Sequence, residues 1–171
     1  MGKVMKKIFV WALVIVMALS MTGCSKKEKR EALIKYVDVD TAELDILCGE
    51  MLDSFNSVVS DNQFNNAVTY KEFKDVTKAK AEATLVEAKE VAELIEDEDI
   101  AEVHGLFIDY LETFIEVIDM AMKGIEESSN DQINRVNARL DEVNEMRMEY
   151  HNRLKELGEE CGVEITYTVV D

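Results

Sequence analysis

The absence of proline constrains this sequence more than any other feature. None of its 171 residues is proline, where average usage would give roughly eight or nine, and only 7 are glycine. β-Sandwiches and barrels need these two residues at their many turns, so an all-β fold is disfavoured. Runs typical of strands occur only near the two ends, which also disfavours alternating strands and helices. We therefore predict an all-α protein.

Apolar residues recur every three or four positions over four long segments, which is the pattern of amphipathic helices. The segments are 41–59, 64–95, 99–125 and 130–161. Because the connections between them are short, successive helices are expected to be antiparallel neighbours. The predicted fold is an antiparallel up-down four-helix bundle with a short extended C-terminal segment. The alternative is a three-helix bundle against which segment 41–59 packs loosely.

The apolar stripes differ in strength between these segments. Segment 99–125 is the most apolar and is expected to contact two neighbouring helices. Segment 130–161 carries a seam similar to that of a coiled coil, in which Arg147 is the single interruption. Segment 64–95 has the weakest stripe, which we expect to face the core and which comprises Val76, Ala79, Ala83, Val86, Val91, Leu94 and Ile95.

Polar residues three positions apart mark three of the expected helix starts, because such pairs can cap the first free backbone N–H groups. The pairs are Asp40 with Glu43, Asp99 with Glu102, and Ser129 with Gln132. Gly162 is expected to end the fourth helix, since glycine readily adopts the left-handed conformation that follows many helices.

Two short runs rich in β-branched residues flank the helical segments. They are Ile34–Val39 and Val163–Val170. In an up-down bundle both runs would lie at the same end, so we expect them to come together there, either paired as a small ribbon supported by the bundle or lying along it. The alternative for the second run is a frayed C-terminal tail.

The first 24 residues have the architecture of an export signal. Three lysines precede an unbroken apolar run of 12 residues, Ile8–Leu19, which is too short to cross a bilayer comfortably. This first segment ends in Met21-Thr22-Gly23-Cys24, which resembles the lipobox of bacterial lipoproteins. The resemblance implies diacylglycerol on the Cys24 thiol, cleavage before Cys24, and a further acyl chain such as palmitate on the new amino terminus. The alternatives are an ordinary cleaved signal and a retained membrane anchor.

This reading divides the chain into three parts. Residues 1–23 are the signal peptide, 24–39 the lipidated N-terminus and a basic tether, and 40–171 an acidic helical bundle domain. Removal of the signal leaves 16 basic and 36 acidic residues, a net charge of −20. Residues 36–171 hold 11 basic and 34 acidic side chains, a net charge of −23. Such a charge argues against nucleic acid as a partner.

No motif for catalysis or metal binding is found in the sequence. The two histidines, His104 and His151, lack the Glu-x-x-His spacing of metal-binding bundles, so no metal or cofactor is expected. We expect His104 on a helix flank and His151 facing solvent. The acidic loop Glu96–Asp99 lacks the glycine and the spacing of a calcium loop and is expected to be a solvated helix start. The chain is therefore not predicted to be an enzyme.

Three side chains on the predicted core faces invite further hypotheses. Cys48 and Cys161 either form one disulfide or remain two buried free thiols. Arg147 is an anchor for an anion inside the bundle, or it reaches the bundle edge while Met146 fills the gap.

The leading hypothesis is a lipid-anchored module at the bacterial cell envelope, with a binding or structural role. It lies outside the cytoplasm on the cell membrane, or on the outer membrane if the host has two membranes. Its expected partners are the membrane, through the anchor, and a basic envelope protein, because the body is strongly acidic. The alternative is a small-ligand receptor with a pocket inside the bundle near Arg147.

Overall fold

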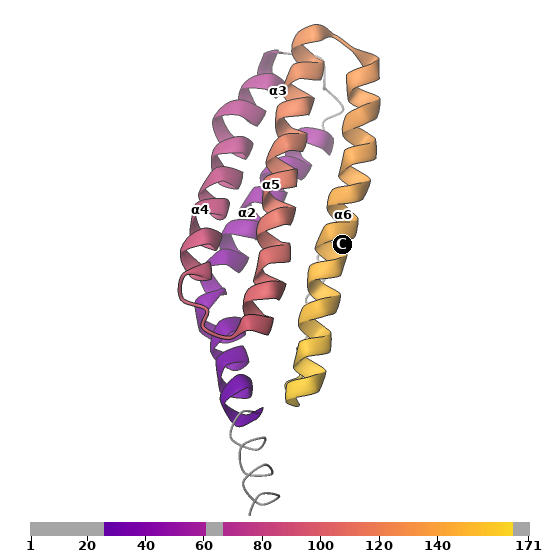
Figure 1. Cartoon of the computed structure of the whole chain (residues 1–171). Coiled ribbons are helices and arrows are strands. Elements are labelled where there is room, and N and C mark those ends of the chain that lie inside the picture. Colours follow the sequence, from indigo (N-terminus) through magenta and orange to yellow (C-terminus); the bar gives the residue numbers. More distant parts are fainter. Residues whose placement is uncertain (1–25, 61–66, 166–171) are drawn as a thin grey trace, which may run out of the picture.

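The structure, a computed structural model, describes residues 26–60 and 67–165. These residues are helical apart from short connections and contain no strand, which confirms the predicted all-α class (Figure 1). Helical residues 26–35 are followed in order by the π-helical turn η1 (Tyr36–Asp40), α2 (Ala42–Ser60), α3 (Ala67–Glu72), the π-helical turn η2 (Phe73–Thr77), α4 (Lys78–Ala92), α5 (Glu98–Glu127) and α6 (Asn130–Cys161).

Residues 34–39 are helical, so the extended run predicted there is wrong, and with it the ribbon it was to form with residues 163–170. Leu33 and Tyr36, three positions apart, are both buried in the core. The Thr41 backbone N–H donates to the Tyr36 carbonyl at 3.0 Å, and the Thr41 hydroxyl donates to the same oxygen at 3.1 Å. Burial on one helical face thus overrides the strand propensity of the valines. Residues 166–170 of the second run lie outside the described residues.

Of the three predicted helix starts, one has its cap at the predicted residue. Ser129 caps α6 by accepting from the Gln132 N–H at 3.3 Å, and Gly162 ends that helix with a positive φ of 69°, as predicted. α5 begins at Glu98, close to the predicted start at 99, but its cap is Asp97, whose carboxylate accepts from the N–H groups of Asp99 and Ile100. α2 begins at Ala42, separated from η1 by Thr41 alone, so Asp40 is the last residue of a π-helical turn and does not follow a loop.

α5 is the central helix of the packing. It packs against both α4 and α6, and α2 packs against α4 (Figure 1). The predicted two-sided apolar face of α5 is confirmed, because the helix buries Ile100, Val103, Phe107, Tyr110, Leu111, Phe114, Val117, Ile118, Ala121 and Ile125. Its 30 residues span about 45 Å, which sets the length of the molecule's core.

α4 buries a different face from the one its apolar stripe predicted, although Val91 of that stripe is buried as predicted. Val76, Val86 and Leu94 are 43%, 57% and 61% exposed. The buried face consists instead of small residues on α4 and the two inward residues of η2, namely Phe73, Thr77, Ala81, Thr84, Ala88 and Val91. Small side chains allow neighbouring helix backbones to approach closely, and a hydroxyl can be buried because each threonine has a partner. Thr84 donates to the Lys80 carbonyl at 2.9 Å, and Thr77 pairs with Ser54 at 2.8 Å.

Three lysines of α4 join it to both neighbours. Lys78 pairs with Asp119 of α5 at 2.6 Å, and Lys89 pairs with Glu112 of α5 at 2.8 Å. On the other side, Lys80 pairs with Glu50 of α2 at 2.7 Å. Exposed ion pairs contribute little to stability, but these pairs flank the buried face and favour one rotation of α4 about its axis.

Candidate functional site

The predicted lipidation site, Cys24, lies outside the described residues. The structure begins two residues later with a helix whose Lys29 forms an ion pair with Asp99 near the start of α5. The charge of this pair and the hydrogen bond within it raise the pKa of Lys29. The basic segment therefore lies beside the ends of α5 and α6 (Figure 1). In the described part of the chain, no helix combines the length and the apolar character needed to cross a membrane.

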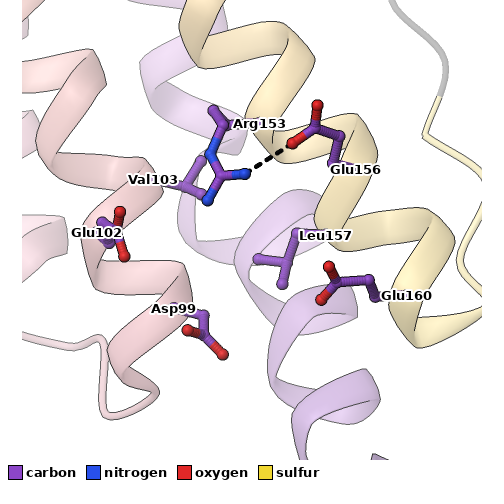
Figure 2. A pocket seen from close by; sticks show the side chains of 7 residues that line it. All are labelled: Asp99, Glu102, Val103, Arg153, Glu156, Leu157 and Glu160. Atoms are coloured by element: carbon purple, nitrogen blue, oxygen red, sulfur yellow. Dashed lines mark hydrogen bonds and ion pairs between the residues drawn. The ribbon is translucent and has the colours of Figure 1, made fainter.

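A small hollow opens at this same end, between the first turns of α5 and the last turns of α6 (Figure 2). Its volume is about 120 Å³. The lining comprises Asp99, Glu102 and Val103 of α5 with Arg153, Glu156, Leu157 and Glu160 of α6. In α5 the residues lie three and four positions after Asp99, and in α6 three, four and seven positions after Arg153, so each set shares one helix face. The buried Val103 and Leu157 form its apolar part, and the charged groups surround them.

The hollow is acidic, with four carboxyl groups against the guanidinium of Arg153. Arg153 is bound to Glu156 at 2.7 Å, and this hydrogen bond raises the Arg153 pKa. The volume is well below the roughly 300 Å³ at which sites for small organic molecules begin.

The sequence indicated only one edge of this hollow. Of the loop Glu96–Asp99, Asp97 serves as the helix cap and Asp99 lines the hollow. The acids of α6 were not singled out, because their partners on α5 lie more than fifty residues away in sequence. Among residues 26–60 and 67–165, no group of three or more histidines, cysteines or carboxylates is arranged to hold a metal ion.

Arg147 lies elsewhere and lines no part of this hollow. It is half-buried, and its charge acts on Cys48, Tyr110 and His151. Within the described chain no carboxylate forms an ion pair with it, and Met146 beside it is also partly buried. A half-buried guanidinium keeps part of its hydration, which is the arrangement expected of a side chain that reaches the bundle edge.

Of the two alternatives for Cys48 and Cys161, the structure has two free thiols rather than a disulfide. Cys161, at the end of α6, lies within electrostatic range of Lys29. Cys48 follows Lys29 by nineteen residues of nearly continuous helix, a rise of about 28 Å. The two sulfurs therefore lie in different parts of the core. Burial raises the pKa of Cys48 to about 12 and also raises that of Cys161.

His104 is buried, contrary to the expectation that it lies on a helix flank. It is only 1% exposed and joins a polar network at the centre of the fold. Its Nε2 lies 2.7 Å from the Ala88 carbonyl oxygen of α4, and its Nδ1 lies 2.9 Å from the Tyr36 hydroxyl of η1. The Tyr36 hydroxyl lies 3.3 Å from that of Tyr150 on α6. One buried network thus joins four elements.

His151 is half-buried rather than facing solvent, with its ring 5.2 Å from that of Tyr150. Burial lowers its pKa, and the charge of Arg147 lowers it further. The two histidines therefore differ: the ring of His104 is enclosed and that of His151 is partly hydrated.

Comparison with known proteins gives no significant match, since no family model, curated protein or solved structure resembles the chain.

Proposed function

We propose that the protein is a lipid-anchored helical module of the bacterial cell envelope, held outside the cytoplasm through Cys24, which binds a basic partner protein. The sequence Met21–Cys24 supports the anchor, through its resemblance to a lipobox. The net charge of −23 over residues 36–171 supports a partner of opposite sign.

We further propose that the helices form an up-down four-helix bundle. Its members are residues 26–60, residues 67–92, α5 and α6, each antiparallel to the next. The packing of α5 against both α4 and α6 supports this arrangement. So do the short connections, Glu93–Asp97 between α4 and α5, and Ser128–Ser129 between α5 and α6.

The acidic hollow is the observation that carries the binding part of the proposal. It combines four carboxylates, one guanidinium and a small apolar floor. Lys29 already places an ammonium group against one of these carboxylates, Asp99, so a cation is accepted at this edge. A lysine or arginine of a partner would meet the remaining acids, Glu102 and Glu160, since Glu156 already binds Arg153.

Anchoring is tested with Cys24→Ser. The parent chain, expressed in bacteria fed radiolabelled palmitate, is expected to incorporate label and to partition into the detergent phase. The variant is expected to do neither. Equal labelling of both chains would exclude lipidation at Cys24.

Binding is tested with a triple variant of the hollow, Glu102→Gln, Glu156→Gln and Glu160→Gln. The matched control carries Asp141→Asn, Glu145→Gln and Glu149→Gln, three exposed acids of α6 away from the hollow. Both variants lose the same charge. The hollow variant is expected to recover less partner from envelope extract at low salt, and recovery by the parent is expected to fall as salt rises. Equal recovery by both variants would show that only the overall charge matters.

A further inference from the structure

The buried network of Tyr36, His104 and Tyr150 has a defined direction of hydrogen bonding. The Ala88 carbonyl can only accept, so His104 Nε2 carries the proton that lies 2.7 Å from it. A neutral imidazole then has Nδ1 as an acceptor, and the Tyr36 hydroxyl donates to it at 2.9 Å. The Tyr150 hydroxyl can in turn donate to Tyr36 at 3.3 Å. Only the bond from the Tyr36 hydroxyl to Nδ1 requires the neutral imidazole, because a protonated Nδ1 would donate to Tyr36 instead.

A second proton on His104 has no anionic partner. η1 presents the phenol of Tyr36, α6 the phenol of Tyr150, and α4 the Ala88 carbonyl. On α5 the neighbours are Phe107, whose ring lies 6.0 Å away, and beyond it Tyr110.

Charged groups on α2 and α6 act on the network only from its edge. Asp45 and Cys48 of α2 act on Tyr150, and Arg147 of α6 acts on Tyr110 and His151. In the described chain no carboxylate hydrogen-bonds to the His104 ring, and burial lowers its pKa. A protonated His104 would thus be a desolvated cation.

We propose that His104 is a proton-sensitive latch: the neutral imidazole holds residues 26–40 against the bundle through Tyr36, and protonation releases that segment. When residues 26–40 separate from the bundle, water can hydrate the protonated imidazole of His104. Residues 26–40 are the segment that this bond holds, because they carry Tyr36, the partner of His104 Nδ1. Leu33, the partly buried Ala32 and Val37, and the exposed pair of Lys29 with Asp99 also attach them.

The consequence is a local opening that depends on pH. Opening returns His104 to an ordinary pKa near 6.5, so the opened form binds a proton more readily than the closed form. The opening constant is therefore expected to be flat above about pH 7. Below about pH 6.5 it is expected to rise roughly tenfold per pH unit until the closed form also titrates. The proposal goes beyond the proposed function and does not depend on lipidation.

Amide hydrogen exchange on the full chain tests the latch between pH 7.5 and 5.0. Exchange is expressed as protection, the intrinsic rate at each pH divided by the observed rate, which removes the pH dependence of the chemistry. The Thr41 amide, bonded to the Tyr36 carbonyl, reports directly on η1. Its protection and that of residues 29–40 are expected to fall about tenfold per pH unit, while amides near Phe114 in α5 keep theirs. A flat profile, or a parallel loss in all helices, would overturn the latch.

Two variants assign the effect to His104. His104→Gln retains one donor and one acceptor but does not titrate, so protection of residues 29–40 is expected to become independent of pH. His151→Gln is the matched control and is expected to keep the parent's profile, because His151 is already partly hydrated. A pH-dependent profile in His104→Gln, or its loss in His151→Gln, would overturn the assignment. Should His104→Gln fail to fold, the imidazole proton resonances of the parent chain decide. The latch requires His104 to titrate below 6.5 together with the loss of protection, and an ordinary titration without that loss would refute it.

Discussion

The buried face of α4 is best tested with the same substitution, alanine to leucine, made at two nearby positions. Ala81 is 0% exposed, whereas Ala83, two residues away, is exposed. Replacement by leucine adds three carbons in each case. At Ala81 these atoms enter a filled core beside α2 and α5, and such overpacking costs about 1–3 kcal/mol. At Ala83 they enter solvent, and only the difference in helix propensity, about 0.2 kcal/mol, remains.

Urea unfolding followed by helical circular dichroism measures this difference. With a denaturant slope of about 2 kcal/mol/M, a loss of about 2 kcal/mol lowers the midpoint by about 1 M. Ala81→Leu is expected to show this decrease, and Ala83→Leu a decrease of about 0.1 M, since both variants share the same propensity term. The apolar stripe of the sequence predicts the reverse order. A larger loss in Ala83→Leu would therefore refute the orientation of α4 described above.

Three further outcomes are expected. In Gly158→Ala the new methyl group would lie 2.8 Å from the Val163 carbonyl oxygen. The urea midpoint of unfolding should therefore fall by a shift worth about 1–2 kcal/mol, although alanine has the better helix propensity. A rise of the midpoint would contradict this packing. Two free thiols, Cys48 and Cys161, are expected in chain that has not been treated with a reductant and whose Cys24 is lipidated or replaced by serine. They should react with a thiol reagent only after the chain is unfolded. If no thiol reacts after unfolding, the two cysteines form a disulfide. Because burial lowers the pKa of His104, the folded state binds fewer protons near pH 6 than the unfolded state does. The stability that neutral His104 contributes is therefore complete above about pH 6.5 and is lost as the pH falls below it. Urea midpoints that do not fall between pH 7.5 and 5.5 would exclude this linkage.

The features that the sequence predicted well are those that local chemistry determines. The fourth predicted segment, 130–161, coincides with α6, because its apolar spacing, the Ser129 cap and Gly162 all agree. The two-sided apolar face of α5 was equally clear, since large aliphatic and aromatic side chains recur on it through eight turns.

The features that the sequence missed depend on neighbours distant in the chain. In α4, alanines alternate with charged residues, so the pattern has little contrast, and the lysine partners on α2 and α5 decide which face is buried. A lone histidine gives no sign of burial, and the partners of His104 are 68 residues before it and 16 residues before it. The hollow likewise forms only when the start of α5 meets the end of α6.

The helix that begins at residue 26 has a mechanical consequence for the proposed anchoring. Only Ser25 separates Cys24 from this helix, which continues with its π-helical turn to Ser60 over about 50 Å. Leu33, nine residues after Cys24, and Tyr36 are buried in the core, so the body holds the chain from these residues on. If Cys24 carries the proposed lipid, this short segment would keep the body close to the bilayer and would pass a lateral force on the body to the acyl chains. A partner would then meet the hollow near the bilayer surface, because the hollow lies at the end of the body where Lys29 pairs with Asp99.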